Sequence, residues 1–261
     1  MASLMGSLLL LGLGITLAWM WILWLIQLRV KSAGLAGFGW SLGVVLLAGL
    51  YAWVGMGWEQ RRVIAVIMAS VWGLRLSSFL LFTRVLGKPE DGRFQQLRKG
   101  WKIEPDRKFL YFFEAHAPLS VLFSLPFLLT AFNTLQEWAP LEKAAMELWF
   151  FALAGEVFVD FQLSHFKKAK ANRKKTCRAG LWNYSRHPNY FFEWLVWCAN
   201  ALFTLSSPYG AWALLCPLLM LFFLFKVSIP ANEVQALRIR GEDYRRYQRT
   251  TSVFVPWFKR A

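Results

Sequence analysis

Long apolar runs separated by short charged connections constrain the fold of this chain more than any other feature. We predict seven membrane-spanning helices, each of about 20 residues, the length that crosses the hydrocarbon core of a bilayer. Their expected bounds are 4–28, 36–58, 63–86, 109–132, 141–162, 189–205 and 210–229. Because 57% of the residues are hydrophobic, this pattern is typical of an all-α polytopic membrane helix bundle. No repeat or linker divides the sequence, which favours a single integral membrane domain over residues 1–261.

The positions of lysine and arginine predict the orientation of the bundle. These residues concentrate after the first, third, fifth and seventh spans, at 29–31, 84–108, 167–186 and 238–260. On the other side, lysine and arginine occur only as Arg61, Arg62 and, at the start of the fifth span, Lys143. Because cytoplasmic loops carry an excess of lysine and arginine, we expect the N-terminus outside and the C-terminus in the cytoplasm, in a bacterial inner membrane. Membrane topology thus accounts for the net charge of +15, and no motif supports binding of nucleic acid.

The stretch 180–197, GLWNYSRHPNYFFEWLVW, places many polar and aromatic groups at the start of an apolar segment. Pro188 predicts the helix start, because a proline lacks the N–H group that has no partner at the first helical position. Arg186 and His187 then lie just before the helix. Four side chains at spacings of four, four and three share one helical face: Asn189, Glu193, Trp197 and Asn200. Carboxylates and amides in a membrane helix need a ligand or a partner, so we predict a binding site on this face.

The basic loop before this helix has two interpretations. Its sequence from Lys167 to Arg178 is KKAKANRKKTCR, which could hold phosphates beside a helix N-terminus that also favours anions. The same residues are typical of a cytoplasmic loop that lies on anionic lipid. The polar helix face nearby favours a phosphate-bearing cofactor. Its expected phosphate contacts are Lys167, Lys168, Arg173 and Arg178.

Acidic residues near the end of the fifth span are also candidates. Glu156 and Asp160 lie four residues apart, on one helical face, and Lys167 follows Asp160 within two turns. Asp160 is expected either to form a structural ion pair with the basic loop or to position a loop arginine or a cofactor amide.

Titratable groups occur within the third and fourth spans. Arg75 lies in the middle of the third, where a charge rarely occurs without a partner or a function. Tyr111, Glu114 and His116 lie in the fourth, and Tyr111 and Glu114 are three apart and can share a face. As catalytic residues, these three could polarise a substrate carbonyl or donate a proton, with Arg75 as their partner. The alternative is a purely structural network with Arg75.

The residues missing from the sequence narrow the chemistry. The three histidines are far apart without a paired spacing, so no metal site is expected. The three cysteines have neither metal-type spacing nor an obvious pairing. There is no Walker A sequence and no GxGxxG, so a nucleotide would be held by helices and basic loops.

Beyond the seventh span, Pro230 predicts the start of an interfacial helix over residues 231–240. Gly241 is its expected end. A second short helix should follow, carrying Tyr244 and Tyr247.

The polar stretch, with VDFQLSHFKK before it and GEDYRRYQRTTSVFVPWF near the C-terminus, resembles the DUF1295 group of the steroid 5-alpha-reductase superfamily of membrane proteins. The segment WGLRLSSFLLFTRVLGKPEDGRF is similar to the same group, so the likeness covers the chain from Trp72 onward. The resemblance implies a seven-helix bundle that holds NADPH in a cavity open to the cytoplasm. The implied reaction is reduction of a C=C bond in a lipid-like, steroid- or sterol-like enone, with hydride transfer to the beta carbon.

Site residues also follow from this resemblance. Asn189 and Glu193 resemble the residues that hold the nicotinamide half, and Trp197 resembles the tryptophan behind them. Asp160 resembles the aspartate that precedes the basic loop, and Tyr184 the tyrosine ahead of the helix. The implied cofactor-binding half is residues 164–261.

Part of the pattern is shared with other membrane enzymes. The RHPxY element, Arg186 to Tyr190, also occurs in sterol C=C reductases and in isoprenylcysteine carboxyl methyltransferases. The C-terminal residues that resemble the methyltransferase pattern are Glu233, Leu237, Gly241, Tyr244 and Tyr247. An S-adenosylmethionine-dependent methyltransferase is therefore the alternative, and a non-enzymatic lipid-binding membrane protein is a third. In each case we expect a lipid-like small molecule and membrane lipids as partners.

Overall fold

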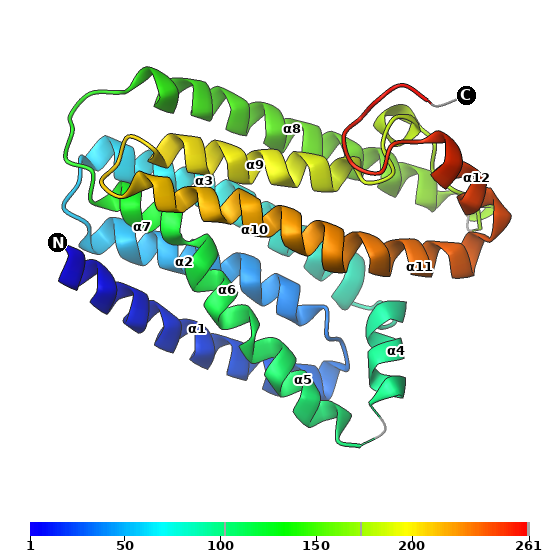
Figure 1. Ribbon diagram of the computed structural model, residues 1–261. Coiled ribbons are helices and arrows are strands. Elements are labelled where there is room, and N and C mark those ends of the chain that lie inside the picture. Colours follow the sequence, from blue (N-terminus) through cyan, green and yellow to red (C-terminus); the bar gives the residue numbers. More distant parts are fainter. Residues whose placement is uncertain (102, 173, 260–261) are drawn as a thin grey trace. The chain divides into compact units, whose positions relative to one another are not determined.

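The computed structural model describes residues 1–101, 103–172 and 174–259. Its named elements within these ranges are all helices, which confirms the all-α class, and Ser185 and Ser252 form an isolated parallel β-bridge. The chain divides into two compact units, and Figure 1 labels most of their helices. Unit 1 comprises Met1–Ala139 with Phe203–Ala213, and unit 2 comprises Pro140–Leu202 with Leu214–Ala261. The single domain over the whole chain stays a prediction.

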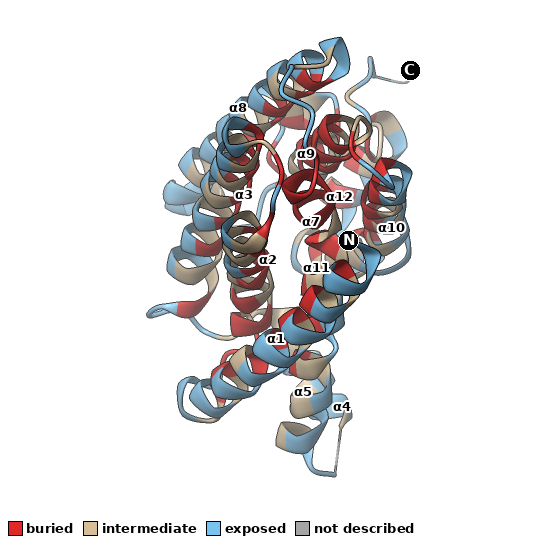
Figure 2. Cartoon of the chain, turned by 90° about the vertical axis from the view of Figure 1, so that its left-hand side faces the viewer, coloured by how far each residue is buried: buried red, intermediate tan, exposed pale blue. Residues whose placement is uncertain are grey.

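Unit 1 is built from helices whose buried residues form narrow stripes. Its elements are α1 (Ala2–Val30), α2 (Leu35–Val54), α3 (Glu59–Leu80) with a π-helical turn (Leu81–Val85), α4 (Gly92–Gly100), α5 (Pro105–Glu114), α6 (His116–Phe123) and α7 (Leu125–Ala131). The buried residues of α1 recur every three or four positions from Met5 to Gln27. Most of the other residues of α1 are exposed although the helix is apolar, as in a helix that faces lipid (Figure 2).

The fourth predicted span is three short helices and not one continuous helix. The breaks fall at Ala115 and Ser124, shortly before Pro118 and Pro126. A proline cannot donate to the carbonyl four residues earlier, so the helical hydrogen-bond pattern is interrupted at both places. The carbonyl of Pro126 accepts a hydrogen bond from the Thr204 hydroxyl at 3.2 Å.

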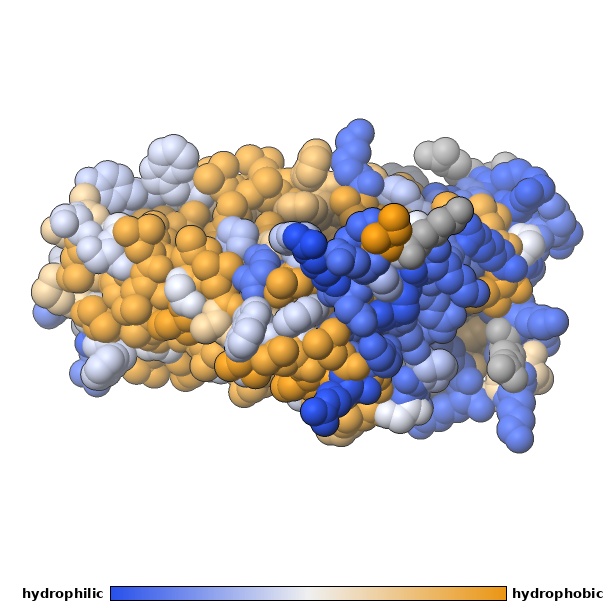
Figure 3. All heavy atoms as spheres, turned by 90° about the horizontal axis from the view of Figure 1, so that it is seen from below, coloured by the Kyte–Doolittle hydropathy of each residue, from blue (hydrophilic) through white to orange (hydrophobic). Residues whose placement is uncertain are grey.

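Five helical segments in the described ranges are long and apolar enough to cross a membrane. They are Ala2–Val30, Leu35–Val54, Glu59–Val85, Pro105–Ala131 and Gly210–Arg240, which correspond to the first four predicted spans and the seventh. The helices that contain the fifth and sixth predicted spans are not among these segments, so the count of seven stays a prediction, as does the orientation. Figure 3 shows an apolar surface that gives way to hydrophilic side chains around α4 and the start of α5.

Arg98 on α4 holds the polar end of unit 1 together. Its guanidinium donates to both carboxylate oxygens of Glu90 at 3.1 Å and to Asp106 at 2.8 Å. It also donates to the side-chain oxygen of the fully buried Gln27 at 3.3 Å. A planar guanidinium suits such multiple contacts, so Arg98 links α4 to both α1 and α5.

Unit 2 contains the predicted cofactor-binding half. Its helices are α8 (Pro140–Lys168), α9 (Pro188–Thr204), α10 (Leu215–Phe223), α11 (Ile229–Arg240) and α12 (Glu242–Thr250), and the last two residues of α9 are assigned to unit 1. The start of α9 at Pro188 is confirmed.

Two boundaries in unit 2 differ from the prediction. The helix α8 continues to Lys168, so Lys167 and Lys168 lie in its last turn and not in a loop, where cations are favoured by the helix dipole. A π-helical turn, Leu224–Ser228, joins α10 to α11, so the interfacial helix is not separate from the seventh span. Pro230 is accommodated in the first turn of α11, and Gly241 follows its end with a φ of 54°, as its role in ending the helix requires.

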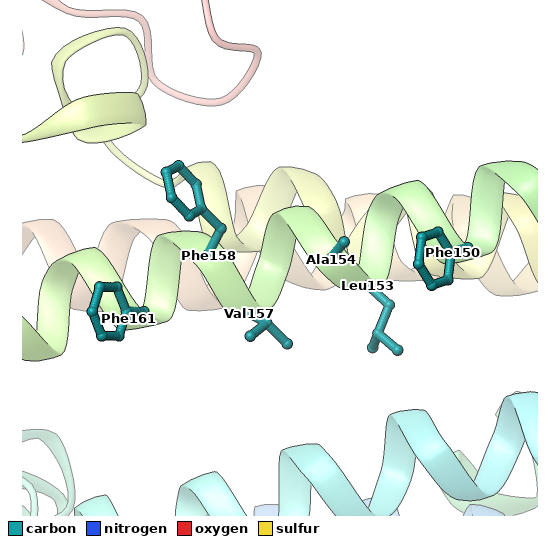
Figure 4. Close-up of a pocket in the computed structure, with 6 residues that line it drawn as sticks. All are labelled: Phe150, Leu153, Ala154, Val157, Phe158 and Phe161. Carbon is teal, nitrogen blue, oxygen red and sulfur yellow. The ribbon is translucent and has the colours of Figure 1, made fainter.

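The helix α8 has a polar buried face and an apolar exposed face. Glu142, Glu156 and Asp160 are buried, whereas Phe150 and Phe161 are 71% and 64% exposed. Six side chains of its apolar face line a groove of about 460 Å³: Phe150, Leu153, Ala154, Val157, Phe158 and Phe161 (Figure 4). This inverted distribution is typical of a helix in contact with lipid.

Candidate functional site

The polar face of α9 is buried, as its periodicity indicates. Glu193 is 8% exposed and Trp197 is fully buried. The indole nitrogen of Trp197 donates to Oε1 of Glu193 at 2.9 Å, which fixes the carboxylate one helical turn away. Asn200 continues the buried face, and Asn189 is half-buried at the first turn. The helix α9 therefore carries the carboxylate of Glu193, fixed by Trp197, and the amide of Asn189 one turn before it.

The carboxylate of Glu233 on α11 contacts the side chains of the two residues that precede α9, Arg186 and His187. Its Oε1 lies 2.8 Å from Nε of Arg186 and 3.3 Å from Nε2 of His187. Gln248 of α12 donates to Oε2 at 2.8 Å, and the hydroxyl of Tyr244 lies 3.5 Å from Oε1. We call these five residues the Glu233 cluster. The side chains of Arg186 and Glu233 are 12% and 16% exposed, so their charges are largely removed from water.

Arg186 also fixes the C-terminal segment. Its Nη1 donates to the carbonyls of Gln248 at 2.6 Å and Thr251 at 3.3 Å, and its backbone N–H donates to Ser252 at 2.8 Å. The hydroxyl of Ser185 donates to the carbonyl of Phe254 at 2.6 Å. The segment before α9 thus holds the end of the chain through hydrogen bonds to its backbone.

Tyr244 and Tyr247 are buried donors in this region. Tyr247 donates to the carbonyls of Ser185, at 2.9 Å, and Trp182. Burial raises the pKa of Tyr247, and burial together with the charge of Glu233 raises the pKa of Tyr244. Both phenols therefore stay protonated at neutral pH and act as hydrogen-bond donors.

The RHPxY element reaches the junction of α10 and α11 through Tyr190. The rings of His187 and Tyr190 stack with centroids 5.4 Å apart and an interplanar angle of 7°. The side-chain amide of Asn232 donates to the hydroxyl of Tyr190 and, at 2.9 Å, to the carbonyl of Ser228.

The basic loop is partly used in holding α12. Arg178 donates to a carboxylate oxygen of Asp243 at 2.8 Å and to its backbone carbonyl at 3.0 Å. The backbone N–H of Thr176 donates to the other carboxylate oxygen at 2.8 Å. Lys167 and Lys168 are exposed, and Arg173 lies outside the described residues.

Two further candidates in unit 2, Asp160 and Tyr184, are not members of the Glu233 cluster. Asp160 is 7% exposed on α8. Tyr184 is 40% exposed, its ring packs against Phe258, and its carbonyl accepts a hydrogen bond from the backbone of Trp257 at 3.1 Å. Their contacts with a cofactor stay predictions.

Asp243 gives a prediction on pH dependence. Burial acts to raise the pKa of its carboxyl, but the hydrogen bonds from Thr176 and the charge of Arg178 outweigh this effect and lower the pKa. A lowered pKa in the folded state stabilises the fold above the unfolded-state pKa of about 4, and this stabilisation is lost as the pH falls through the folded-state value. Asp243→Asn is therefore expected to melt below wild type at neutral pH, and the difference should shrink as the pH is lowered below about 4. Circular dichroism melts in detergent test this; a difference that does not change as the pH is lowered below about 4 would contradict it.

The predicted catalytic residues lie in unit 1. Tyr111 is 60% exposed and Glu114 is half-buried, both on α5. Nδ1 of His116 lies 2.7 Å from the carbonyl of Phe112, which can only accept, so this nitrogen carries the proton. The guanidinium carbon of Arg75 lies 5.8 Å from the ring centroid of Phe79. The catalytic roles of these residues stay predictions.

Sequence reasoning missed Gln248, Ser185 and Asp243. Gln248 lies four residues after Tyr244, so its place on the same face of a short helix was a usable signal. Nothing local marked Ser185 or Asp243, because their partners, Phe254 and Arg178, are 69 and 65 residues away.

The helical architecture of the described residues, with five segments suited to crossing a membrane, defines an integral membrane protein. The chain belongs to the family described as protein of unknown function (DUF1295), whose model matches residues 23–251. Comparisons with curated proteins and with solved structures found no significant match.

Proposed function

We propose that this protein is an NADPH-dependent membrane reductase that acts on a C=C bond of a lipid-like enone. The observation that best supports the proposal is the carboxylate of Glu193, buried on α9 and held by the Trp197 indole, with Asn189 one turn before it. A nicotinamide carboxamide needs an acceptor for its N–H groups and a donor for its carbonyl. Glu193 offers the acceptor and Asn189 offers the donor, so this donor set fits the group.

The phosphates would be held at the end of α8 and in the loop that follows. Lys167 and Lys168 are exposed there and lie in a helix end, and Arg173 would add a third cation. Arg178 forms an ion pair with Asp243. We therefore propose two roles for it: it positions this loop beside α12, and it binds phosphate. The Glu233 cluster would hold the segment before α9 in place and so fix the position of Asn189 in the first turn of the helix.

Bound NADPH would supply a hydride to the beta carbon of the enone. The chain would supply the polarisation of the substrate carbonyl and a proton for the alpha carbon, through Tyr111, Glu114 or His116, with Arg75 as their electrostatic partner. Reduction then consumes one hydride and one proton for each double bond.

We also propose the full topology of seven spans, with the N-terminus outside and the C-terminus in the cytoplasm of a bacterial cell. The distribution of lysine and arginine supports it. It would put the basic end of α8 and the Glu233 cluster on the side where NADPH is available.

The experiment is a thermal-shift and calorimetric titration of the purified protein with NADPH, NADH and S-adenosylmethionine in parallel. A ligand that binds the native state raises its apparent stability by mass action. We expect stabilisation by NADPH, a much weaker effect of NADH, and affinity for NADPH about tenfold lower in Glu193→Gln, since a charged hydrogen-bond acceptor is lost. Glu242→Gln, an exposed carboxylate on α12, is the control and should bind as wild type. Binding of S-adenosylmethionine alone, or of none of the three, would contradict the proposal.

A methyltransferase on the same scaffold is the second candidate. It is supported by the Glu233 cluster, which joins Arg186 and His187 of the RHPxY element to Glu233 and Tyr244 of the methyltransferase-like pattern. S-adenosylmethionine carries no phosphate, so the double variant Lys167→Gln, Lys168→Gln should weaken NADPH binding and leave S-adenosylmethionine binding unchanged. Absence of binding of either cofactor would favour the non-enzymatic lipid-binding protein.

A further inference from the structure

A groove of about 420 Å³ lies where α2 ends and α3 begins, within unit 1. Gly49, Ala52 and Trp53 line it from α2, and Glu59 and Arg62 line it from the first turn of α3. Both helices are long and apolar enough to cross a membrane, so the short connection between them is expected at a membrane surface. Trp53 is 83% exposed, and a tryptophan at this depth is typical of the boundary between lipid and water.

The charged side chains of the groove keep hydrogen-bonding groups that have no hydrogen-bond partner in the described structure. Arg62 donates one hydrogen bond, from Nη1 to the carbonyl of Ala52 at 2.5 Å. Its Nε is shielded from solvent and has no hydrogen-bond partner within the described ranges. Glu59 is exposed, one helical turn before Arg62, and no ion pair of its carboxylate occurs in the described residues. The groove therefore offers a guanidinium and a carboxylate side by side.

The rest of the groove is apolar and open. Val63 and Ile67 follow Arg62 on the same face of α3 and are 49% and 47% exposed. On α2, no atom lies within 4 Å of the position that a β-carbon on Gly49 would take. From Arg62 to Ile67 this apolar strip extends for about 8 Å along the helix, enough to contact the first part of an acyl chain.

We propose that this groove binds one phospholipid with a primary-amine headgroup, such as phosphatidylethanolamine. The phosphate meets Arg62 in a charge-assisted hydrogen bond, the ammonium meets Glu59, and an acyl chain lies along Val63 and Ile67 beside Gly49. The carboxylate provides the selectivity, because it repels a purely anionic lipid and cannot receive a hydrogen bond from a quaternary ammonium.

The test is native mass spectrometry of the full chain, titrated with phosphatidylethanolamine, phosphatidylglycerol or phosphatidylcholine of equal chain length. We expect the first molecule of phosphatidylethanolamine to bind about tenfold more tightly than either of the others, an increment of one charge-assisted hydrogen bond. Glu59→Gln should abolish this preference and leave binding of phosphatidylglycerol equal or stronger. Soluble glycerophosphoethanolamine should fail to compete, because it lacks the acyl chain.

Two further variants separate the headgroup from the chain. Gly49→Val fills open space beside α2 without touching Glu59 or Arg62, and is expected to weaken binding of all three lipids. Arg62→Gln should also weaken all three, and if it does not fold, the Glu59→Gln result decides alone. Arg107→Gln, an exposed arginine on α5, is the control and should bind as wild type. Equal affinity for the three lipids in wild type, or an unchanged preference in Glu59→Gln, would overturn the proposal.

Discussion

Arg61→Met is expected to destabilise the protein by about 3–5 kcal/mol, the range found when one member of a buried polar network is removed. Arg61 is fully buried at the start of α3. Its guanidinium donates to the carbonyls of Glu137, at 2.7 Å, and Leu135, and contacts that of Asn133 at 3.4 Å. Without it, these carbonyls lose the donor that they share.

Aromatic rings add to this effect. The guanidinium carbon of Arg61 lies 5.3 Å from the ring centroid of Trp58 and 5.6 Å from that of Trp138. Methionine keeps the length and part of the packing of the side chain but removes its hydrogen bonds and its cation–π contacts. Arg61 therefore holds the loop after α7 against the start of α3.

Reversible unfolding in mixed detergent micelles measures the change in free energy. Arg107→Met is the matched control, because its ion pair with Glu104 is exposed to water and should not affect the transition. An Arg61→Met protein within about 1 kcal/mol of wild type would show that the carbonyls find other donors.

Glu233→Gln is expected to destabilise the protein by about 3 kcal/mol, the lower end of the range for breaking a buried ion pair. The substitution leaves Arg186 with a largely buried charge at 12% exposure. It also replaces one of the two carboxylate oxygens, which lie against His187 and Gln248, by an NH₂ group that cannot accept. Since Arg186 also holds the carbonyls of Gln248 and Thr251, we expect the segment after α12 to detach before the helices unfold.

Limited proteolysis distinguishes this release from a general loss of stability. The Glu233→Gln protein should be cut after α12 under conditions in which wild type and Glu242→Gln stay intact. A double-mutant cycle with Arg186→Met tests the pair itself, and the effects should fall short of additivity. Additive effects, with no early cleavage, would contradict the role of Glu233 in holding Arg186.

Features that depend on neighbouring residues could be predicted from the amino-acid sequence alone. The start of α9 at Pro188 and the end of α11 before Gly241 follow from backbone chemistry that each residue carries with it. The buried face with Glu193 and Trp197 follows from helical periodicity. Apolar length similarly predicted five of the seven spans, which the structure shows as suitable segments.

The partners of the charged side chains, in contrast, depend on how the helices pack and could not be predicted. Arg178 could equally serve a phosphate or a carboxylate in the sequence, and the fold brings it 2.8 Å from Asp243. The sequence alone does not show which lysine or arginine pairs with Glu233. The packing of α11 beside the RHPxY element brings it to Arg186. Helix formation depends on contacts between residues three or four apart, whereas an ion pair between residues far apart in sequence depends on how whole helices pack.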